Sequence, residues 1–235
     1  MDARNITFIT REEEMKKLFL LGVILSIGLL NTKAQVRVGM VGGLLSSDFK
    51  VESIDGGLDG KLRPSFGASF DYSVQENLFV NAKVLYQSVF AEGGSALEDI
   101  DLEFNAKFLE LPITLKYEFG TTVNPYLMMG VNLAYNMDAD VKFTMNNVDF
   151  EGDFSEQVKD FTFGILFGGG VSYKLPNFIL FLEGSYMIGT DNILVAGEYE
   201  IRNSTITLTN TIDDNDVVKL RNLNVLAGIM IPLGL

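Results

Sequence analysis

The sequence predicts an all-β fold: an eight-stranded antiparallel up-and-down β-barrel that spans a membrane. Three observations predict it. From Val36 onward the dominant pattern is an apolar side chain at every second position, and this is the period of strands with two different faces. Brief turns and long polar connections alternate strictly between the segments, as they do in membrane barrels. A secretory signal precedes the first segment.

The N-terminal region has the order of an export signal. Met15-Lys16-Lys17 is basic, residues 18–30 are apolar, and Thr32 and Ala34 supply small side chains at the positions that signal peptidase reads. The apolar run is too short for the roughly 20 residues of a membrane-spanning helix, which disfavours an uncleaved anchor. We expect an N-terminal extension and cleavable signal over 1–34 and a barrel domain over 35–235. The acidic residues ahead of Met15 indicate that translation starts there.

Eight segments carry the alternation, and they are long enough for the roughly 9–11 residues with which a tilted strand crosses a membrane. In 161–175, for example, Phe161 and Phe163 alternate with Thr162 and Gly164. An even number of strands is the rule for single-chain bacterial barrels. The expected strands are 36–45, 62–74, 78–90, 104–119, 125–141, 161–175, 177–190 and 217–234.

The connections between these segments indicate how the barrel lies in the membrane. Short turns are expected at 75–77, at 120–124 and at Pro176, and both termini fall at the same rim as these turns. Short turns are periplasmic in outer-membrane barrels, so both termini are expected in the periplasm. The remaining connections are predicted to be long external loops that serve as contact surfaces; they are 46–61, 91–103, 142–160 and 191–216.

The alternation alone does not tell which face points inward. A soluble barrel or sandwich would bury its apolar face and expose the polar one. The lipid-facing interpretation is favoured by the export signal and by the Gly and Ser residues on the polar faces, because the interior of an eight-stranded barrel is narrow. Aromatic girdles are then expected at both interfaces. They are Tyr72, Tyr117, Phe119, Tyr126, Tyr173 and Phe178 near the short turns, and Tyr86, Phe90, Tyr135, Phe143, Phe161 and Tyr186 near the long connections.

Composition excludes several classes of function. The chain has no Cys and no His, so it lacks thiolate ligands, the commonest transition-metal ligand and the commonest general base. A net charge of −13 disfavours nucleic acid, which is bound by clusters of Lys and Arg. No pair of carboxylates is singled out by a motif for acid–base work. We therefore expect no enzyme activity, no catalytic residues, no cofactor and no metal site.

Eight charged side chains are predicted to lie on the face that points into the lumen. They are Arg37, Asp71, Lys83, Glu110, Lys116, Glu118, Lys174 and Glu183. Unpaired charges are costly in a medium of low dielectric constant, so the mixed signs predict pairing across strands. One interpretation is a narrow ion path or gate. The other, which the small lumen favours, is a structural network of salt bridges that fills the barrel.

Two further features stand out in the sequence. Asp213-Asp214-Asn215-Asp216 gathers oxygen ligands of the kind that calcium prefers, but it lacks the spacing of an EF-hand loop, so a solvated acidic loop is favoured over a cation site. Pro112 lies within an expected strand, where it cannot donate to the ladder, and it predicts a bulge.

The chain resembles the PorT-like outer-membrane β-barrel family of Bacteroidetes. The stretch Phe108-Leu109-Glu110-Leu111-Pro112-Ile113-Thr114-Leu115-Lys116-Tyr117 carries most of the resemblance, and 125–130, 168–171 and 182–186 support it. Leu235 departs from the aromatic residue that often ends the last strand. The resemblance implies an outer-membrane location and, as for some members of that family, a link to protein-secretion machinery.

The expected function is a structural or interaction role for a monomeric barrel in the outer membrane of a Gram-negative bacterium. Its expected partners are outer-membrane lipid and lipopolysaccharide, with secretion-machinery proteins implied by the resemblance. Two alternatives remain open: a narrow channel for small solutes or ions, and an adhesin that acts through the long external loops.

Overall fold

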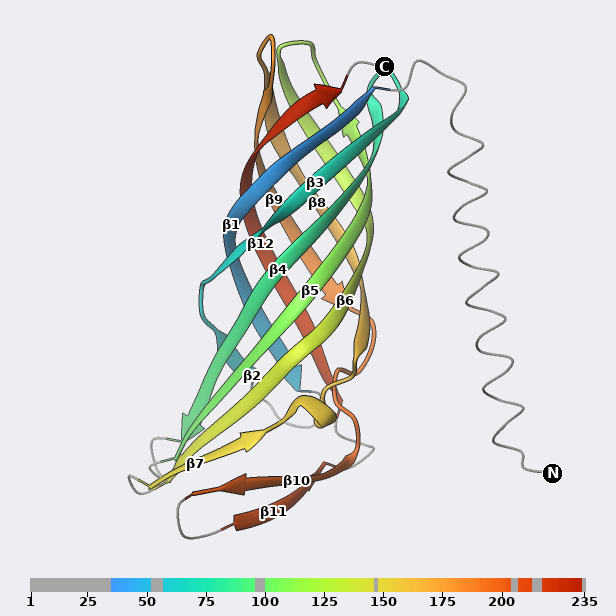
Figure 1. Cartoon of the computed structure of the whole chain (residues 1–235). Coiled ribbons are helices and arrows are strands. Elements are labelled where there is room, and N and C mark those ends of the chain that lie inside the picture. Colours follow the sequence, from blue (N-terminus) through green and yellow to red (C-terminus); the bar gives the residue numbers. More distant parts are fainter. Residues whose placement is uncertain are drawn as a thin grey trace, which may run out of the picture.

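The structure is a computed structural model that describes residues 35–51, 57–95, 100–145, 148–203, 207–212 and 217–233 (Figure 1). The expected signal segment over 1–34, the acidic stretch 213–216 and Leu235 lie outside these residues. In the part of the chain that the structure describes, no helix is long and apolar enough to cross a membrane.

An eight-stranded ring forms the body of the molecule, and every neighbouring pair in it is antiparallel. The ring closes because β1 pairs along its whole length with β12, from Val36 opposite Leu233 to Val51 opposite Val218. This confirms the predicted barrel. In chain order its strands are β1 (Val36–Val51), β3 (Arg63–Gln75), β4 (Leu78–Ser95), β5 (Ile100–Glu118), β6 (Val123–Met145), β8 (Phe161–Lys174), β9 (Ile179–Gly189) and β12 (Val218–Leu233).

The short connections β3–β4, β5–β6 and β8–β9 gather at one rim, beside the start of β1 and the end of β12 (Figure 1). We call this end the short-turn rim. Gly120 turns the chain between β5 and β6 with a φ of 103°, a left-handed conformation that favours glycine. A Cβ there would lie 2.6 Å from the carbonyl oxygen of Val123, so the turn excludes larger residues.

Apolar side chains cover the outside of the ring. Phe161, Phe163 and Ile165 on β8 are each 54% exposed, whereas Thr162 and Gly164 between them face the lumen and are buried. Such a belt of exposed large side chains fits hydrocarbon and does not fit water. Aromatic pairs mark both ends of the belt, with Tyr117 and Phe119 near the short-turn rim. Phe66 with Tyr86 and Tyr135 with Phe161 lie toward the opposite end. Phe167 with Tyr186 lies between the two ends, opposite Met129.

Four sequence predictions about single residues are wrong. Tyr126 does not belong to a girdle, because it points into the lumen and is 3% exposed. Phe143 packs against Phe150 beyond the belt, and Phe90 lies beyond it too, opposite Asn105 and in cation–π contact with Arg63. Pro112 causes no bulge: the β4–β5 ladder lacks the pairs opposite Pro112 and Leu111 but resumes in the same register on both sides. The missing backbone donor therefore interrupts the ladder without adding a residue.

The strands continue well past the lipid-facing belt at the opposite rim. A register shift between β5 and β6 leaves Met137 as an extra residue, since Phe108 pairs with Asn136 and Lys107 with Asp138. This bulge brings Asp138, in place of Ala139, to the outward face. The outward side of β6 therefore changes from apolar to charged at this point.

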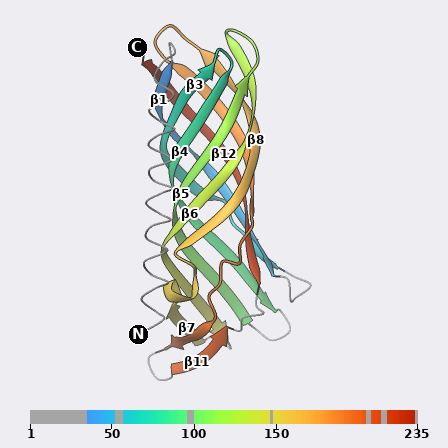
Figure 2. The same ribbon diagram turned by 90° about the vertical axis from the view of Figure 1, so that its right-hand side faces the viewer.

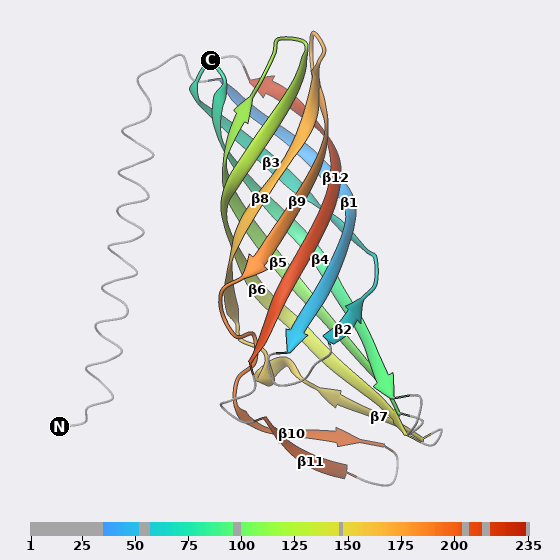
Figure 3. The same ribbon diagram turned by 180° about the vertical axis from the view of Figure 1, so that it is seen from behind.

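Four more strands and a short helix lie beyond this level, in connections that the sequence predicted as loops. They are β2 (Gly57–Gly60), β7 (Val148–Asp153), η1 (Ser155–Gln157), β10 (Gly197–Arg202) and β11 (Thr207–Ile212). β7 pairs with the end of β6, and the β10–β11 hairpin joins β7 through Arg202 and Glu151 (Figures 2 and 3). We call residues 88–95, 100–107, 138–145, 148–158, 197–203 and 207–212 the extension. The prediction of loops failed because strand pairing continues in a sequence whose polar composition is typical of loops.

Candidate functional site

The short-turn half of the lumen holds a network of ion pairs. Glu118 receives a hydrogen bond from Arg37 Nη1 at 2.6 Å and lies within 3.4 Å of Lys116 Nζ and 3.3 Å of Lys174 Nζ. Asp71 lies against Lys116 Nζ and 3.7 Å from Arg37 Nη1. All except Lys174 are almost fully buried; the Lys174 side chain is 32% exposed, at the rim. The ring of Phe79 lies 4.0 Å from the Arg37 guanidinium, in cation–π contact.

A second ion pair lies deeper in the lumen. Lys83 Nζ is 2.8 Å from Glu183 Oε1 and also donates to Asn81, which in turn donates to Asp71 at 2.6 Å. Tyr126 donates its hydroxyl to Glu183 at 3.1 Å. A Cβ at Gly170 would lie 2.6 Å from the Tyr126 ring. Gly170 therefore leaves the space that this tyrosine occupies.

Glu110 is placed apart from the other predicted lumenal charges. It is 1% exposed and accepts hydrogen bonds from Asn132 and Asn222, both at 3.0 Å. No ion pair among the described residues includes it. Ser47 donates to Asn222 at 2.7 Å, and the resulting polar layer crosses the lumen from β5 to β12 and β1.

The sequence prediction missed the neutral members of these layers. Asn81, Asn132 and Asn222 hold the carboxylates, and Gln87 donates across the lumen to Asn224 at 3.1 Å. A signal for them was present, because each lies an even number of residues from another lumenal residue on its own strand. Tyr126 also lies an even number of residues from Asn132, but its own side chain gave no signal, since Leu127 beside it is equally apolar.

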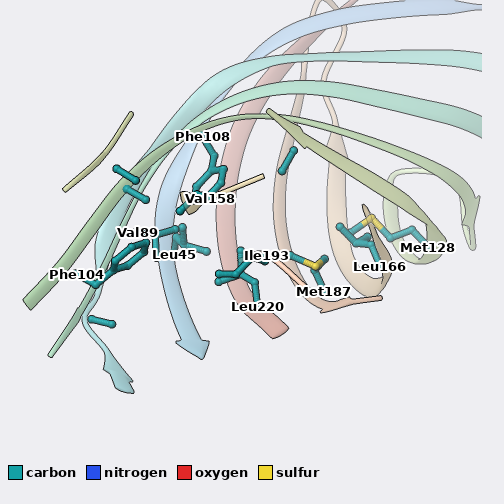
Figure 4. Close-up of a cluster of buried hydrophobic side chains, with 14 of the residues drawn as sticks. Leu45, Val89, Phe104, Phe108, Met128, Val158, Leu166, Met187, Ile193 and Leu220 are labelled. Atoms are coloured by element: carbon teal, nitrogen blue, oxygen red, sulfur yellow. The ribbon is translucent and has the colours of Figure 1, made fainter. Parts of the chain in front are cut away.

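An apolar plug closes the lumen at the rim opposite the short turns (Figure 4). Leu45, Val89, Phe108 and Leu220 from the wall are each at most 1% exposed. Val158 and Ile193 from the connections complete the cluster. These connections are paired across the barrel mouth, with Lys159 N donating to Ile193 O at 2.8 Å and Val195 N to Gln157 O at 2.8 Å.

Little space remains between these layers. A cavity of about 10 Å³ lies beside Glu110, Lys83 and Glu183, which is about the room that one water molecule needs. Ion pairs, a polar layer and an apolar plug therefore follow one another along the lumen.

A large concave surface lies on the outward face of the extension. Residues paired across strands share a face, and Asp140 is paired with Asn105 and Asp153, while Glu151 is paired with Lys142 and Arg202. This face continues the lipid-facing side of the wall beyond the bulge. It encloses about 1650 Å³, and we call it the acidic groove. Its charged lining is Glu103, Asp140, Asp149, Glu151, Asp153, Glu156, Glu198 and Glu200, with Arg63, Lys142 and Arg202.

The electrostatics of the acidic groove follow from this excess of carboxylates. Burial and the charge of Asp138 raise the pKa of Asp140, and Lys107 opposes the shift. Hydrogen bonding and attraction to Glu151, 2.7 Å away, raise the pKa of Lys142. Hydrogen bonds from Ser155 lower the pKa of Asp153. Among the described residues, no group of three or more carboxylates is arranged to hold a metal ion. With eight carboxylates against three basic side chains in its lining, the acidic groove is a negative surface.

Comparisons with known proteins agree with the fold. A family model described as "Outer membrane protein beta-barrel domain" matches residues 31–195. The chain is similar to a major outer membrane protein from Thermus thermophilus, with 11% identity, 86% of this chain and 100% of that chain covered, and a TM-score of 0.51. None of the curated proteins matches the sequence.

Weaker likenesses extend to two further barrels. Neisserial surface protein A has 17% identity, with 86% of this chain and 98% of that chain covered and a TM-score of 0.41. Ail, the attachment invasion locus protein of Yersinia pestis, has 14% identity, with 83% and 98% covered and a TM-score of 0.39. At these identities the likeness concerns the fold alone.

Proposed function

Because the chain belongs to the outer membrane protein beta-barrel domain family, we propose that it is a closed outer-membrane barrel with an interaction role. Family membership and the apolar belt locate the chain in the outer membrane. In this proposal the barrel is a monomeric anchor in lipid and lipopolysaccharide. The extension is the part that meets a partner.

The filled lumen is the observation that carries this proposal. An eight-stranded interior is just wide enough for side chains to fill, and here the charges, the polar layer and the apolar plug occupy it in turn. Salt bridges between Arg37, Asp71, Lys116 and Glu118 serve as filling that holds the wall strands together. The lumen then has a structural role and no transport role. The absence of His from the sequence supports a non-enzymatic role.

The orientation follows from the lengths of the connections. Short turns are periplasmic in barrels of this kind, which would place both termini in the periplasm and the extension outside the cell. The acidic groove would then lie just above the lipid surface, where it would attract a basic segment of a partner protein. The PorT-like resemblance of residues 108–117 supports a search for that partner among secretion components.

The measurement that tests a closed lumen is single-channel conductance in planar bilayers. We expect the folded barrel to give no resolved current steps across the voltage range in which an open porin conducts in the same bilayers. A heat-shift assay on the same sample would show that the protein is folded and inserted. Regular steps from the folded protein would overturn the proposal in favour of a narrow channel.

A further inference from the structure

We infer that the open edge of β11 binds an extended polypeptide strand that carries basic side chains at alternate positions. The inference rests on the proposed interaction role and specifies how the partner is bound. Two independent features of the extension meet at this edge: a strand with only one partner among the described strands, and the acidic groove.

β11 is the last strand in the path of the sheet. One of its edges pairs with β10, from Gly197 opposite Ile212 to Arg202 opposite Thr207, and no described strand pairs with the other. Edge strands are usually protected by Lys, Pro, a bulge or a covering segment. β11 has the sequence Thr-Leu-Thr-Asn-Thr-Ile, which contains none of these protective residues. Its backbone can therefore accept a further strand.

The acidic groove determines which side chains the added strand should carry. Thr209 is opposite Glu200, so the two share a face, and both line the groove together with Glu198. An added strand would lie about 4.8 Å from β11 and roughly 10 Å from β10. Lys and Arg are long enough to pass over the small threonines toward Glu198 and Glu200. Every second residue of the partner is therefore expected to be basic.

The opposite face of the hairpin favours uncharged residues at the intervening positions. Ile212 is 7% exposed, and the Tyr199 ring contacts Phe154 at 5.0 Å between centroids. This face packs toward the apolar side of the extension. The preferred partner is thus a strand in which basic and apolar residues alternate.

The test compares two nine-residue peptides of identical composition in binding to the full barrel in detergent. One alternates Lys with Val, and the other carries all Lys residues in one block. We expect the alternating peptide to bind at least ten times more tightly. N-methylation of its backbone along one edge should abolish binding, whereas methylation along the other edge should be tolerated, because only one edge pairs.

Charge reversal in the barrel supplies the matched control. Glu200→Lys, beside β11, should weaken binding of the alternating peptide at least tenfold. Glu103→Lys changes the same charge within the groove but lies on β5, four strands away in the sheet, and should change binding less than threefold. Equal affinity for both peptides, or equal loss in both variants, would overturn strand addition and leave the interaction role intact. Failure of both peptides to bind would overturn the groove as a basic-partner site as well.

Discussion

Replacing Glu118 by Gln is expected to lower the free energy of unfolding of the barrel by about 3–5 kcal/mol, the usual cost of removing one partner from a buried ion pair. The carboxylate contacts Arg37, Lys116 and Lys174. Its removal leaves the first two cations buried, with Asp71 as their remaining carboxylate. The measurement is urea unfolding of the barrel in lipid vesicles.

Lys174→Met is the matched control for this network. Its side chain is 32% exposed at the rim, so its ion pair is partly screened by water and should contribute about 1 kcal/mol or less. A larger loss of unfolding free energy in Glu118→Gln than in Lys174→Met indicates that the stabilising ion pairs are the buried ones. Equal costs for Glu118→Gln and Lys174→Met would contradict a structural role for the lumenal charges.

Met129→Arg is expected to cost about 2–4 kcal/mol, the penalty for an arginine on the lipid face at the middle of the bilayer. Met129 is 66% exposed and lies halfway along the lipid-facing part of β6, between Val123 and Tyr135. The same urea titration in vesicles measures the change in the free energy of unfolding. Ser88→Arg, outward-facing on the extension, should change stability by less than about 0.5 kcal/mol. If both variants lowered the free energy of unfolding equally, Met129 would not face hydrocarbon.

The alternation in the sequence was sufficient to predict the wall strands, because one face must differ from the other along their whole length. Where both faces of a strand are apolar, the sequence did not tell which alternate residues face the lumen. In β6, Tyr126 and Met128 face the lumen, while Leu127 and Met129 face outward. The bulge at Met137 was not predictable, since it depends on how β6 pairs with β5.

The extension was missed for a related reason. Its strands are held by pairing between connections, such as Glu151 with Arg202, and polar composition is typical of a loop when such pairing is not known. Alternation also indicated which charges face inward. The alternation could not indicate which charges pair with each other. Lys83 and Glu183 lie on different strands, and they meet across the lumen only because of the register between all the strands of the ring.

The central claim is that apolar side chains of the wall face lipid while polar ones face the lumen. A single-cysteine scan along β6 tests it most directly, and it is feasible because the chain has no native cysteine. Each variant is labelled with a fluorophore and exposed in vesicles to lipid-borne and water-borne quenchers. We predict lipid quenching at Leu127, protection from both quenchers at Asn132, and water quenching at Asp138 and Asp140. Lipid quenching at Asn132 with protection at Leu127 would contradict the account.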